Sequence, residues 1–265
     1  MKKIILSFII IIMVTIPYKK EIKGELLYVL HNNETINTII VFLKKHNIYD
    51  QYKHVQTIRE EYRLELYQMM KDIHDIMEEV KITYWIEGGT LLGAVRHKGI
   101  IPWDDDLDIQ MYATDHEKFL VQVVPVLKKL GYEYSAFKIT SSKTKFKTLK
   151  GEIPPSCDIF LATEKKGKLD VGDDWKHISV DDLFPLKLYD FGNVTVWGAH
   201  NPIPYLDDCY GKTWPNRGVK DLNHSKEEDP STSKMPFVLD GDHFKPGYPL
   251  GPLKDNKPLI KEFLK

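Results

Sequence analysis

The sequence predicts an α+β domain, an α/β hybrid in which a small mixed sheet is flanked by helices. Two patterns lead to this prediction. Apolar residues recur at steps of three and four between residues 55 and 80, which is typical of a long amphipathic helix. Short segments that are mainly apolar (82–86 and 157–161) or that alternate between acidic and apolar residues (106–109) follow, and their lengths are typical of strands. At 265 residues, the chain is long enough to bury one substantial core.

Residues 1–23 are set apart from this domain as a signal peptide or a signal anchor. An apolar run at 4–16 follows two lysines and ends at Pro17. At about 1.5 Å per residue its helix is shorter than the roughly 30 Å hydrocarbon layer, which favours a signal peptide. Lysines beyond the run could extend its reach, so an uncleaved anchor stays open. Residues 24–52 are expected to form a stem or linker helix.

Both alternatives for residues 1–23 predict contact with a membrane and a place in the secretory pathway. An uncleaved anchor would make the chain a single-pass Golgi or ER membrane protein with its folded domain in the lumen. A cleaved signal peptide would make it a secreted protein.

Capping residues and helix-breaking residues predict where the next helices begin and end. The helix at 55–80 could form a coiled-coil dimer or, as is more common, pack on the sheet of its own domain. The sequence Thr-Asp-His-Glu that starts at Thr114 predicts a capping box with Thr114 as the N-cap. We expect the helix that follows to kink at Pro125 and to end at Gly131.

Turns and composition divide the rest of the chain. Residues 132–139 are expected to form a strand, residues 164–178 a loop, and residues 184–210 irregular structure that lines a cleft. Residues 224–265 are rich in Lys, Glu, Pro and Gly without a strong period, which predicts a partly irregular tail. The domain that holds the motifs is therefore placed at residues 53–223.

Four aspartates lie within five residues, at Asp104, Asp105, Asp106 and Asp108, among apolar neighbours. Such a cluster is costly to bury unless positive charge lies against it. Alternate residues of a strand share a face, so Asp106 and Asp108 are expected to point the same way, and Asp104 would share that face. Carboxylates that converge in this way suit a hard divalent cation such as Mg²⁺.

A glycine pair precedes the aspartates. Gly88, Gly89 and Thr90 are expected to form a turn that leads into a short helix, which carries Arg96 and Lys98. The first N–H groups of a helix are free to bind an anion, and glycine lets a phosphate approach them closely. Arg96 and Lys98 could neutralise the remaining phosphate charge, and the guanidinium suits forked contact with phosphate oxygens.

Three neighbouring features each have two interpretations. Trp103 could pack beneath the acids or stack on a nucleobase. His97 is expected to be a surface or supporting residue rather than a general base. Lysines recur between residues 138 and 150, which predicts either a phosphate-facing hairpin or a solvated basic loop.

The segment from Glu87 to Ile109 resembles the diagnostic block of the LicD/fukutin family of phosphotransferases. That resemblance implies the nucleotidyltransferase fold of the DNA polymerase β type, whose pattern is a glycine pair followed by Asp-hydrophobic-Asp-hydrophobic. The family pattern ends with a carboxylate on a later strand, for which Asp158 is the candidate. Further similarity occurs at 182–186 and 205–214.

The resemblance assigns roles to these residues. It implies that Asp106, Asp108 and Asp158 are catalytic and hold Mg²⁺ or Mn²⁺, with Asp104 as a possible further ligand. It also implies transfer of a phosphorylated alcohol, such as phosphocholine or a polyol phosphate, from a CDP-linked donor to a hydroxyl of a glycan or glycoconjugate. Gly88, Gly89, Thr90, Arg96, Lys98 and Trp103 are then the expected substrate-binding residues.

Net charge and cysteine content narrow the range of possible functions. With 37 basic and 38 acidic residues the formal net charge is -1, so no global field draws the chain to nucleic acid. Two cysteines are too few for a disulfide framework. Two other functions stay open: a metal-dependent glycosyltransferase, because Asp-x-Asp also holds a metal and a nucleotide sugar, and a membrane-tethered, non-catalytic glycan-binding homologue.

Overall fold

The computed structural model describes residues 58–143, 146–148, 151–170, 178–220, 235–239, 241–244 and 251–265. The predicted signal or anchor segment and the stem helix lie outside these residues. The chain divides into two units, one made of residues 57–215 and 240–265 and the other of residues 1–56 and 216–239. Within the described ranges, no helix combines the length and apolar character that crossing a bilayer requires.

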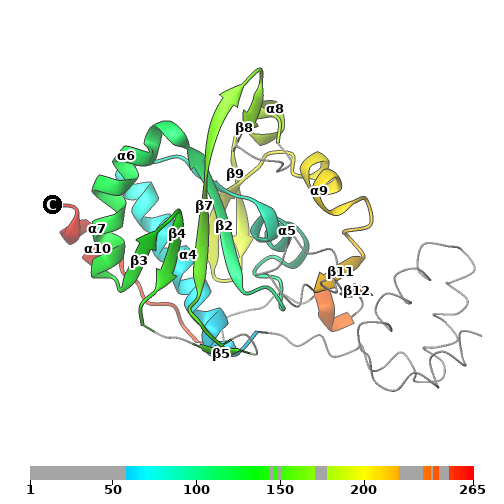
Figure 1. The fold of residues 1–265 in the computed structure, drawn as a ribbon, viewed down its shortest axis with the longest axis horizontal. Helices are drawn as coiled ribbons and strands as arrows, with labels where there is room; N and C mark the ends of the chain where they lie inside the picture. Colours follow the sequence, from blue (N-terminus) through cyan, green and yellow to red (C-terminus); the bar gives the residue numbers. More distant parts are fainter. Residues whose placement is uncertain are drawn as a thin grey trace, which may run out of the picture. The chain divides into compact units, whose positions relative to one another are not determined.

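The long amphipathic helix is confirmed as α4 (Glu60–Val80). Its apolar side is buried, with Leu66, Met70 and Ile73 fully inaccessible to solvent. It packs against the sheet of its own unit, behind the central strands in the view of Figure 1. The helix ends where Lys81 adopts the left-handed conformation, a common way to stop an α-helix.

The sheet is small and mixed, as predicted. Its strands lie in the order β1-β2-β7-β4-β3, and β8 pairs with β7. The bounds are β1 (Tyr84–Ile86), β2 (Asp106–Tyr112), β3 (Tyr132–Ser135), β4 (Lys138–Ser141), β7 (Ser156–Lys165) and β8 (Lys168–Asp170). The β2–β7 pair is parallel and the other pairs are antiparallel. This pairing places the two acid-bearing strands side by side.

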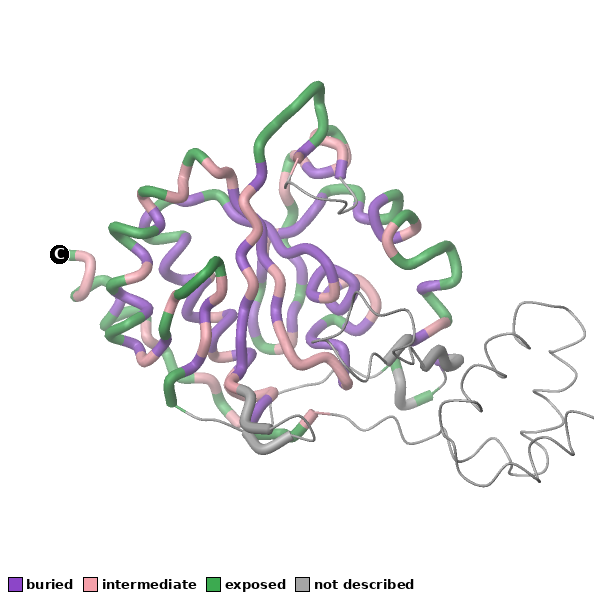
Figure 2. The backbone as a smooth tube through the Cα atoms, in the orientation of Figure 1, coloured by how far each residue is buried: buried purple, intermediate pink, exposed green. Residues whose placement is uncertain are grey.

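Alternation along β2 and β7 separates apolar from acidic side chains. Leu107, Ile109 and Cys157 are completely buried on one face of the sheet. Asp106, Asp108 and Asp158, at the alternate positions, are only partly buried. Figure 2 shows the buried backbone concentrated in these central strands.

The segment after β2 is helical, but the predicted capping box is wrong. The chain enters a 3-10 turn (Ala113–Asp115) directly from Tyr112, so Thr114 lies inside the turn, and neither N-cap residue there forms a side-chain cap. The helix continues as α6 (His116–Lys118), a π-helical turn (Phe119–Val123) and α7 (Val124–Lys129).

The π-helical turn lies directly before Pro125, at the place where a kink was predicted. Proline lacks the N–H that an α-helix needs at this point, and a wider turn accommodates the loss. Leu127 is buried and Leu130 nearly so, which confirms the inward face of this helix. Gly131, with φ +88°, ends it as expected.

Three expectations for the middle of the chain are wrong. Residues 132–139 form a hairpin, β3 and β4, rather than one strand, because Ala136 and Phe137 adopt left-handed conformations between them. Part of the expected loop at 164–178 is the β7–β8 hairpin. The segment 184–210 is regular, with strands β9 (Lys187–Phe191) and β10 (Val194–Gly198) and helix α9 (Ile203–Tyr210).

Strands β9 and β10 alternate between buried and exposed residues. The many aromatic residues of this segment made the alternation difficult to recognise in the sequence. Tyr189, Phe191, Val194 and Val196 are buried at alternate positions of the β9–β10 hairpin. Gly192 supplies the positive φ, +61°, that the tight turn requires. The β9–β10 hairpin is therefore part of the packed core rather than irregular structure.

The remaining elements are short. They are β5 (Phe146–Thr148), β6 (Gly151–Ile153), α8 (Val180–Leu183), β11 (Arg217–Lys220), β12 (Met235–Val238), a 3-10 turn (Gly241–Phe244) and α10 (Lys257–Phe263). Helix α10 packs on α4 through Ile260, which is 1% exposed. The end of the predicted irregular tail is thus an ordered helix, because Ile260 gives it one residue to bury.

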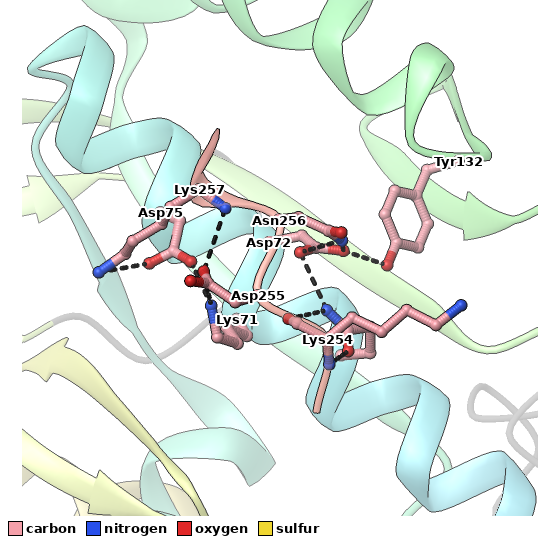
Figure 3. A network of polar contacts seen from close by, with 9 residues as sticks. Lys71, Asp72, Asp75, Tyr132, Lys254, Asp255, Asn256 and Lys257 are labelled. Atoms are coloured by element: carbon pink, nitrogen blue, oxygen red, sulfur yellow. Dashed lines mark hydrogen bonds and ion pairs between the residues drawn. The ribbon is translucent and has the colours of Figure 1, made fainter. Parts of the chain in front are cut away.

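A buried carboxylate fixes the segment before α10 to α4 (Figure 3). Asp72, fully buried on α4, accepts hydrogen bonds from the Tyr132 hydroxyl (2.8 Å), the Asn256 amide (2.9 Å) and the Gln68 amide (3.0 Å). Burial raises the pKa of Asp72, although these hydrogen bonds oppose the shift. One side chain therefore joins α4, β3 and the chain that leads into α10.

Replacing Asp72 by Ala should lower the free energy of unfolding by about 2–4 kcal/mol, because the buried hydroxyl of Tyr132 loses its acceptor. Chemical denaturation of the purified protein measures the change. Asp190→Ala is the matched control: Asp190 is exposed on β9, and its loss should stay within about 0.5 kcal/mol. Equal losses in the two variants would show that the Asp72 network contributes nothing specific.

Candidate functional site

The structure brings the three predicted catalytic carboxylates together. Asp108 of β2 and Asp158 of β7 are direct partners in the parallel ladder, and Asp106 lies two residues before Asp108 on the same face. One oxygen from each of the three carboxylates lies within 4.8 Å of the others. Register between two neighbouring strands is therefore enough to assemble the cluster.

Asp104 and Asp105 extend the cluster. They precede β2, so Asp104 does not occupy the strand position that was predicted for it. Its carboxylate nevertheless lies within 4.8 Å of those of Asp105 and Asp106. Asp105, one of the four clustered aspartates but not a predicted ligand, belongs to the same group.

The glycine pair lies against these carboxylates. Gly88 and Gly89 are the first two residues of α5 (Gly88–His97) rather than a turn before it. The N–H of Gly89 donates to Asp108 Oδ2 at 3.2 Å. A Cβ at position 88 would lie 2.7 Å from Asp108 Oδ2, and one at position 89 would lie 2.6 Å from Asp104 Oδ2. Glycine is required here because the acids occupy the space of a side chain.

Thr90 anchors the start of α5 to β2. Its hydroxyl accepts a hydrogen bond from the N–H of Asp108 at 2.8 Å, and the N–H of Glu87 donates to the carbonyl of Asp108 at 3.2 Å. Thr90 is buried, and its hydroxyl positions Asp108 relative to the helix. Its expected contact with the substrate stays a prediction.

The field inside the cluster is strongly negative. Burial, and then repulsion from Asp106, raise the pKa of both Asp104 and Asp108 well above the ordinary value for aspartate. Burial also raises the pKa of the neighbouring Glu87 to about 8. The site is thus arranged to favour the binding of a cation.

Lys138 is a cation that contacts the cluster. It is the first residue of β4, pairs with Asp158 across the β4–β7 ladder, and its ammonium lies 3.0 Å from Asp158 Oδ1. Burial lowers the pKa of Lys138, but the hydrogen bond to Asp158 and attraction to Asp158, Asp106 and Asp108 together outweigh burial, so the net pKa is raised. The phosphate-facing interpretation of the basic run stays a prediction.

Helix α9 approaches the acids from another side. The hydroxyl oxygen of Tyr205 accepts from the N–H of Gly88 at 3.3 Å. Tyr210, at the end of α9, has 40% of its surface exposed. Burial of its hydroxyl, and then repulsion from Asp108 and Asp104, raise the pKa of Tyr210 well above the ordinary value for tyrosine. The 205–214 block, noted for its similarity to the family, contributes these two tyrosines.

The hydroxyl of Tyr62 connects the two chain segments that lead into the acid-bearing strands β2 and β7. The hydroxyl of Tyr62, on α4, lies 2.8 Å from the carbonyl of Asp105 and 3.2 Å from the carbonyl of Pro154. Asp105 directly precedes β2, and Pro154 lies two residues before β7. Tyr62 is 4% exposed and therefore tied to the core. No sequence signal distinguishes it from the other residues of the amphipathic stripe.

The predicted basic residues of α5 differ in their placement. Arg96 donates to the carbonyl of Trp214 at 2.7 Å, and burial lowers the pKa of its guanidinium to about 10 while Asp104 acts to raise it. Lys98 is exposed at the opposite end of α5 from Gly88, about 15 Å along the helix axis. The structure therefore places Arg96 within the field of the acids and does not bring Lys98 to them.

Trp103 and His97 contact each other. Their rings meet edge to face with centroids 5.6 Å apart. His97 is 1% exposed, so the expectation of a surface residue is wrong and that of a supporting one fits. Trp103 is partly buried against the core, which agrees with packing beside the acids rather than with a freely exposed stacking surface.

The donor set fits a hard divalent cation. Oxygen ligands from carboxylates are those that Mg²⁺ and Mn²⁺ prefer, and Asp106, Asp108 and Asp158 supply three of them at mutually compatible distances. The pKa of Asp108 is raised first by burial and then by neighbouring like charges, which a cation would neutralise. These three residues would hold the ion, with Asp104 beside them.

Comparison with known proteins places the chain in a family. The profile described as LicD/FKTN/FKRP, nucleotidyltransferase domain, matches residues 81–201. An uncharacterized protein of Rickettsia typhi, RT0683, is 38% identical over 77% of this chain and 64% of its own length. RP689 of Rickettsia prowazekii is 38% identical over 74% of each chain.

A relative with a functional name matches a shorter stretch. The lipopolysaccharide cholinephosphotransferase LicD of Haemophilus influenzae is 44% identical over 64 residues, 24% of each chain. The chain thus spans somewhat less than two thirds of RT0683 and about a quarter of LicD. The family profile covers β1, β2 and β7, and with them the glycine pair and the three converging carboxylates. This chain belongs to the LicD/fukutin family of phosphotransferases.

Proposed function

We propose that this protein is a metal-dependent transferase that moves a phosphorylated alcohol, phosphocholine or a polyol phosphate, from a CDP-linked donor to a hydroxyl of a glycan. The observation that carries the proposal is the convergence of Asp106, Asp108 and Asp158 within 4.8 Å beside the glycine start of α5. Membership of the family supports phosphotransfer as the class of reaction. The nucleotidyltransferase fold of the polymerase β type is part of the same proposal.

The proposed reaction breaks a phosphoanhydride bond and forms a phosphate ester bond. The acceptor oxygen forms a bond to the distal phosphorus of the donor, and the bond from that phosphorus to the bridging oxygen breaks. CMP leaves with the bridging oxygen, and the product is a phosphodiester. The proton of the acceptor hydroxyl passes to a carboxylate of the site, for which Asp158 is the candidate, and from there to solvent.

The chain's own residues supply position and charge. Mg²⁺ or Mn²⁺, when bound, contributes neutralisation of the phosphate oxygens. Because residues 88 and 89 are glycines, the acids lie directly against the start of α5, where the donor phosphates would bind between the helix N-terminus and the metal. Arg96 adds positive charge near Asp104, and Tyr210 gives the site a partly exposed aromatic wall. Phosphoryl transfer relies on such positioning more than on covalent chemistry.

The predicted localisation is part of the proposal and rests on sequence alone. Residues 1–23 would direct the domain to the secretory pathway, either as a luminal domain anchored in the Golgi or ER membrane or as a secreted protein.

A donor screen tests the proposed function. The full chain is incubated with CDP-choline, CDP-ribitol or CDP-glycerol and a glycan acceptor, and released CMP is measured with and without Mg²⁺. We expect release of CMP from at least one donor that stops when EDTA removes the metal. Release from all donors that continues without divalent metal would contradict the proposal.

The same assay separates the two alternative functions. Turnover of UDP-sugars but of no CDP-alcohol would indicate a metal-dependent glycosyltransferase. Absence of turnover with every donor, together with calorimetric binding of the glycan but of neither nucleotide nor metal, would indicate a non-catalytic glycan-binding protein. Each outcome replaces the proposed function with a different one.

A further inference from the structure

A row of three side chains crosses the central sheet. Asp108 on β2 is the ladder partner of Asp158 on β7, and Asp158 is the ladder partner of Lys138 on β4. Direct partners in neighbouring strands project from the same face at similar height. The lysine therefore lies beside the carboxylates, on the side away from Asp106 and α5.

The ion pair between Lys138 and Asp158 is close but contributes little to the free energy of unfolding. The ammonium of Lys138 lies 3.0 Å from Asp158 Oδ1, while 42% of the Lys138 side chain and 27% of the Asp158 side chain are exposed. Pairs with that much solvent contact contribute between zero and about 1 kcal/mol. A structural role alone gives little reason for a cation at this position.

The charges of the site suggest what the lysine does. Asp104, Asp105, Asp106, Asp108 and Asp158 bring up to five negative charges, and a divalent cation offsets two. A nucleoside diphosphate ester adds further negative charge, so its diphosphate would be repelled unless another cation faced it. The ammonium carries three N–H donors, Asp158 accepts from one, and partial exposure leaves room for a phosphate oxygen.

We propose that Lys138 binds a non-bridging oxygen of the donor's diphosphate and so fixes the donor at the Asp158 end of the carboxylate cluster. This inference rests on the proposed function, because it assumes a diphosphate as the ligand. An ammonium on a flexible stem is a common point-charge ligand for phosphate. The alternative role is that of a counterion that only positions Asp158.

Nucleotide binding distinguishes the two roles without turnover. Calorimetry measures the affinity of CDP in the presence of Mg²⁺, the affinity of cytidine as a probe without phosphate, and the affinity of Mn²⁺ without nucleotide. The proteins are the full-length chain, Lys138→Met, Lys138→Arg and Lys143→Met. Lys143 is the matched control, since it is an exposed lysine whose ammonium lies over the Tyr132 ring, 4.3 Å from its centroid.

Lys138→Met should weaken CDP binding by about tenfold or more, which is the size expected for one hydrogen bond to a charged group. Its binding of cytidine should be unchanged, and Mn²⁺ should bind as well or more tightly, because the cation that competes for Asp158 is gone. Lys138→Arg should restore most of the CDP affinity, and Lys143→Met should match the unaltered protein. Thermal unfolding of each variant checks that the fold is retained.

Two results would overturn the inference. Unchanged CDP affinity in Lys138→Met would exclude the phosphate contact, and a loss of Mn²⁺ affinity as large as the loss of CDP affinity would assign the lysine to positioning Asp158. The proposed function fails separately. If the unaltered protein binds CDP through Lys138 yet releases no CMP from any CDP-alcohol, the transferase assignment is wrong and the phosphate contact stands.

Discussion

A protein in which Asp106 and Asp108 are both replaced by Asn should lose metal-dependent transfer, with CMP release reduced by more than about 100-fold. The two carboxylates come from one strand face and lie with Asp158 in a single cluster, so the double change removes two of three converging oxygen ligands. Amide oxygens are weaker ligands for Mg²⁺ because they carry no charge. Release of CMP from the donor identified in the screen measures the effect.

The double variant should remain folded, which separates loss of chemistry from loss of structure. Repulsion among the acids raises the pKa of Asp108 and Asp104, so removing two charges relieves that repulsion. The melting temperature should therefore be unchanged or higher. Asp190→Asn, on the exposed side of β9, is the matched control and should retain full activity. An undiminished rate in the double variant would exclude the proposed mechanism.

Replacing Gly88 by Ala should reduce both activity and stability. Gly88 has φ +53°, which costs other residues about 1–2 kcal/mol. The added Cβ would also lie 2.7 Å from Asp108 Oδ2, so the carboxylate has to move. A displacement of about 1 Å at a reacting centre can cost about 100-fold in rate. We expect a loss of that order in CMP release, measured together with the free energy of unfolding.

Gly167→Ala separates strain from displacement of the carboxylate. Gly167 has a similar conformation, φ +73°, but a Cβ there meets nothing within 4 Å. This variant should lose about the same stability through strain and keep its activity. If both glycine variants lost activity in parallel, the effect at position 88 would come from general destabilisation rather than from the contact with Asp108.

Local periodicity was enough to predict the acid-bearing face. The alternation of Asp106 and Asp108 with Leu107 and Ile109 predicted one polar and one apolar side of β2, and the structure has both. The stripe of α4 was equally clear because many apolar residues repeat with the helical period. Asp158 needed more than periodicity, since only the resemblance to a family pattern connected it with the first two acids.

Features that depend on pairing between distant segments could not be predicted. The contact between Lys138 and Asp158 follows from the register of β4 against β7, which no local pattern reveals. The hydroxyl of Tyr62 reaches two carbonyls far away in the sequence. The capping box failed for a related reason, because the exit of β2 fixes the backbone at Thr114 before its side chain can act as a cap.

The parallel pairing of β2 and β7 makes the chemistry tolerant of change in one place and intolerant in another. Successive side chains of β7 alternate between faces, so sliding this strand by a single position would turn Asp158 into the core and Cys157 toward the acids. The connection between the two strands contains α6, α7, β3 and β4, which are held in place by their own packing and strand pairing. Insertions are therefore tolerated only in the turns between these elements, where they leave the β4–β7 register and the reaction centre unchanged.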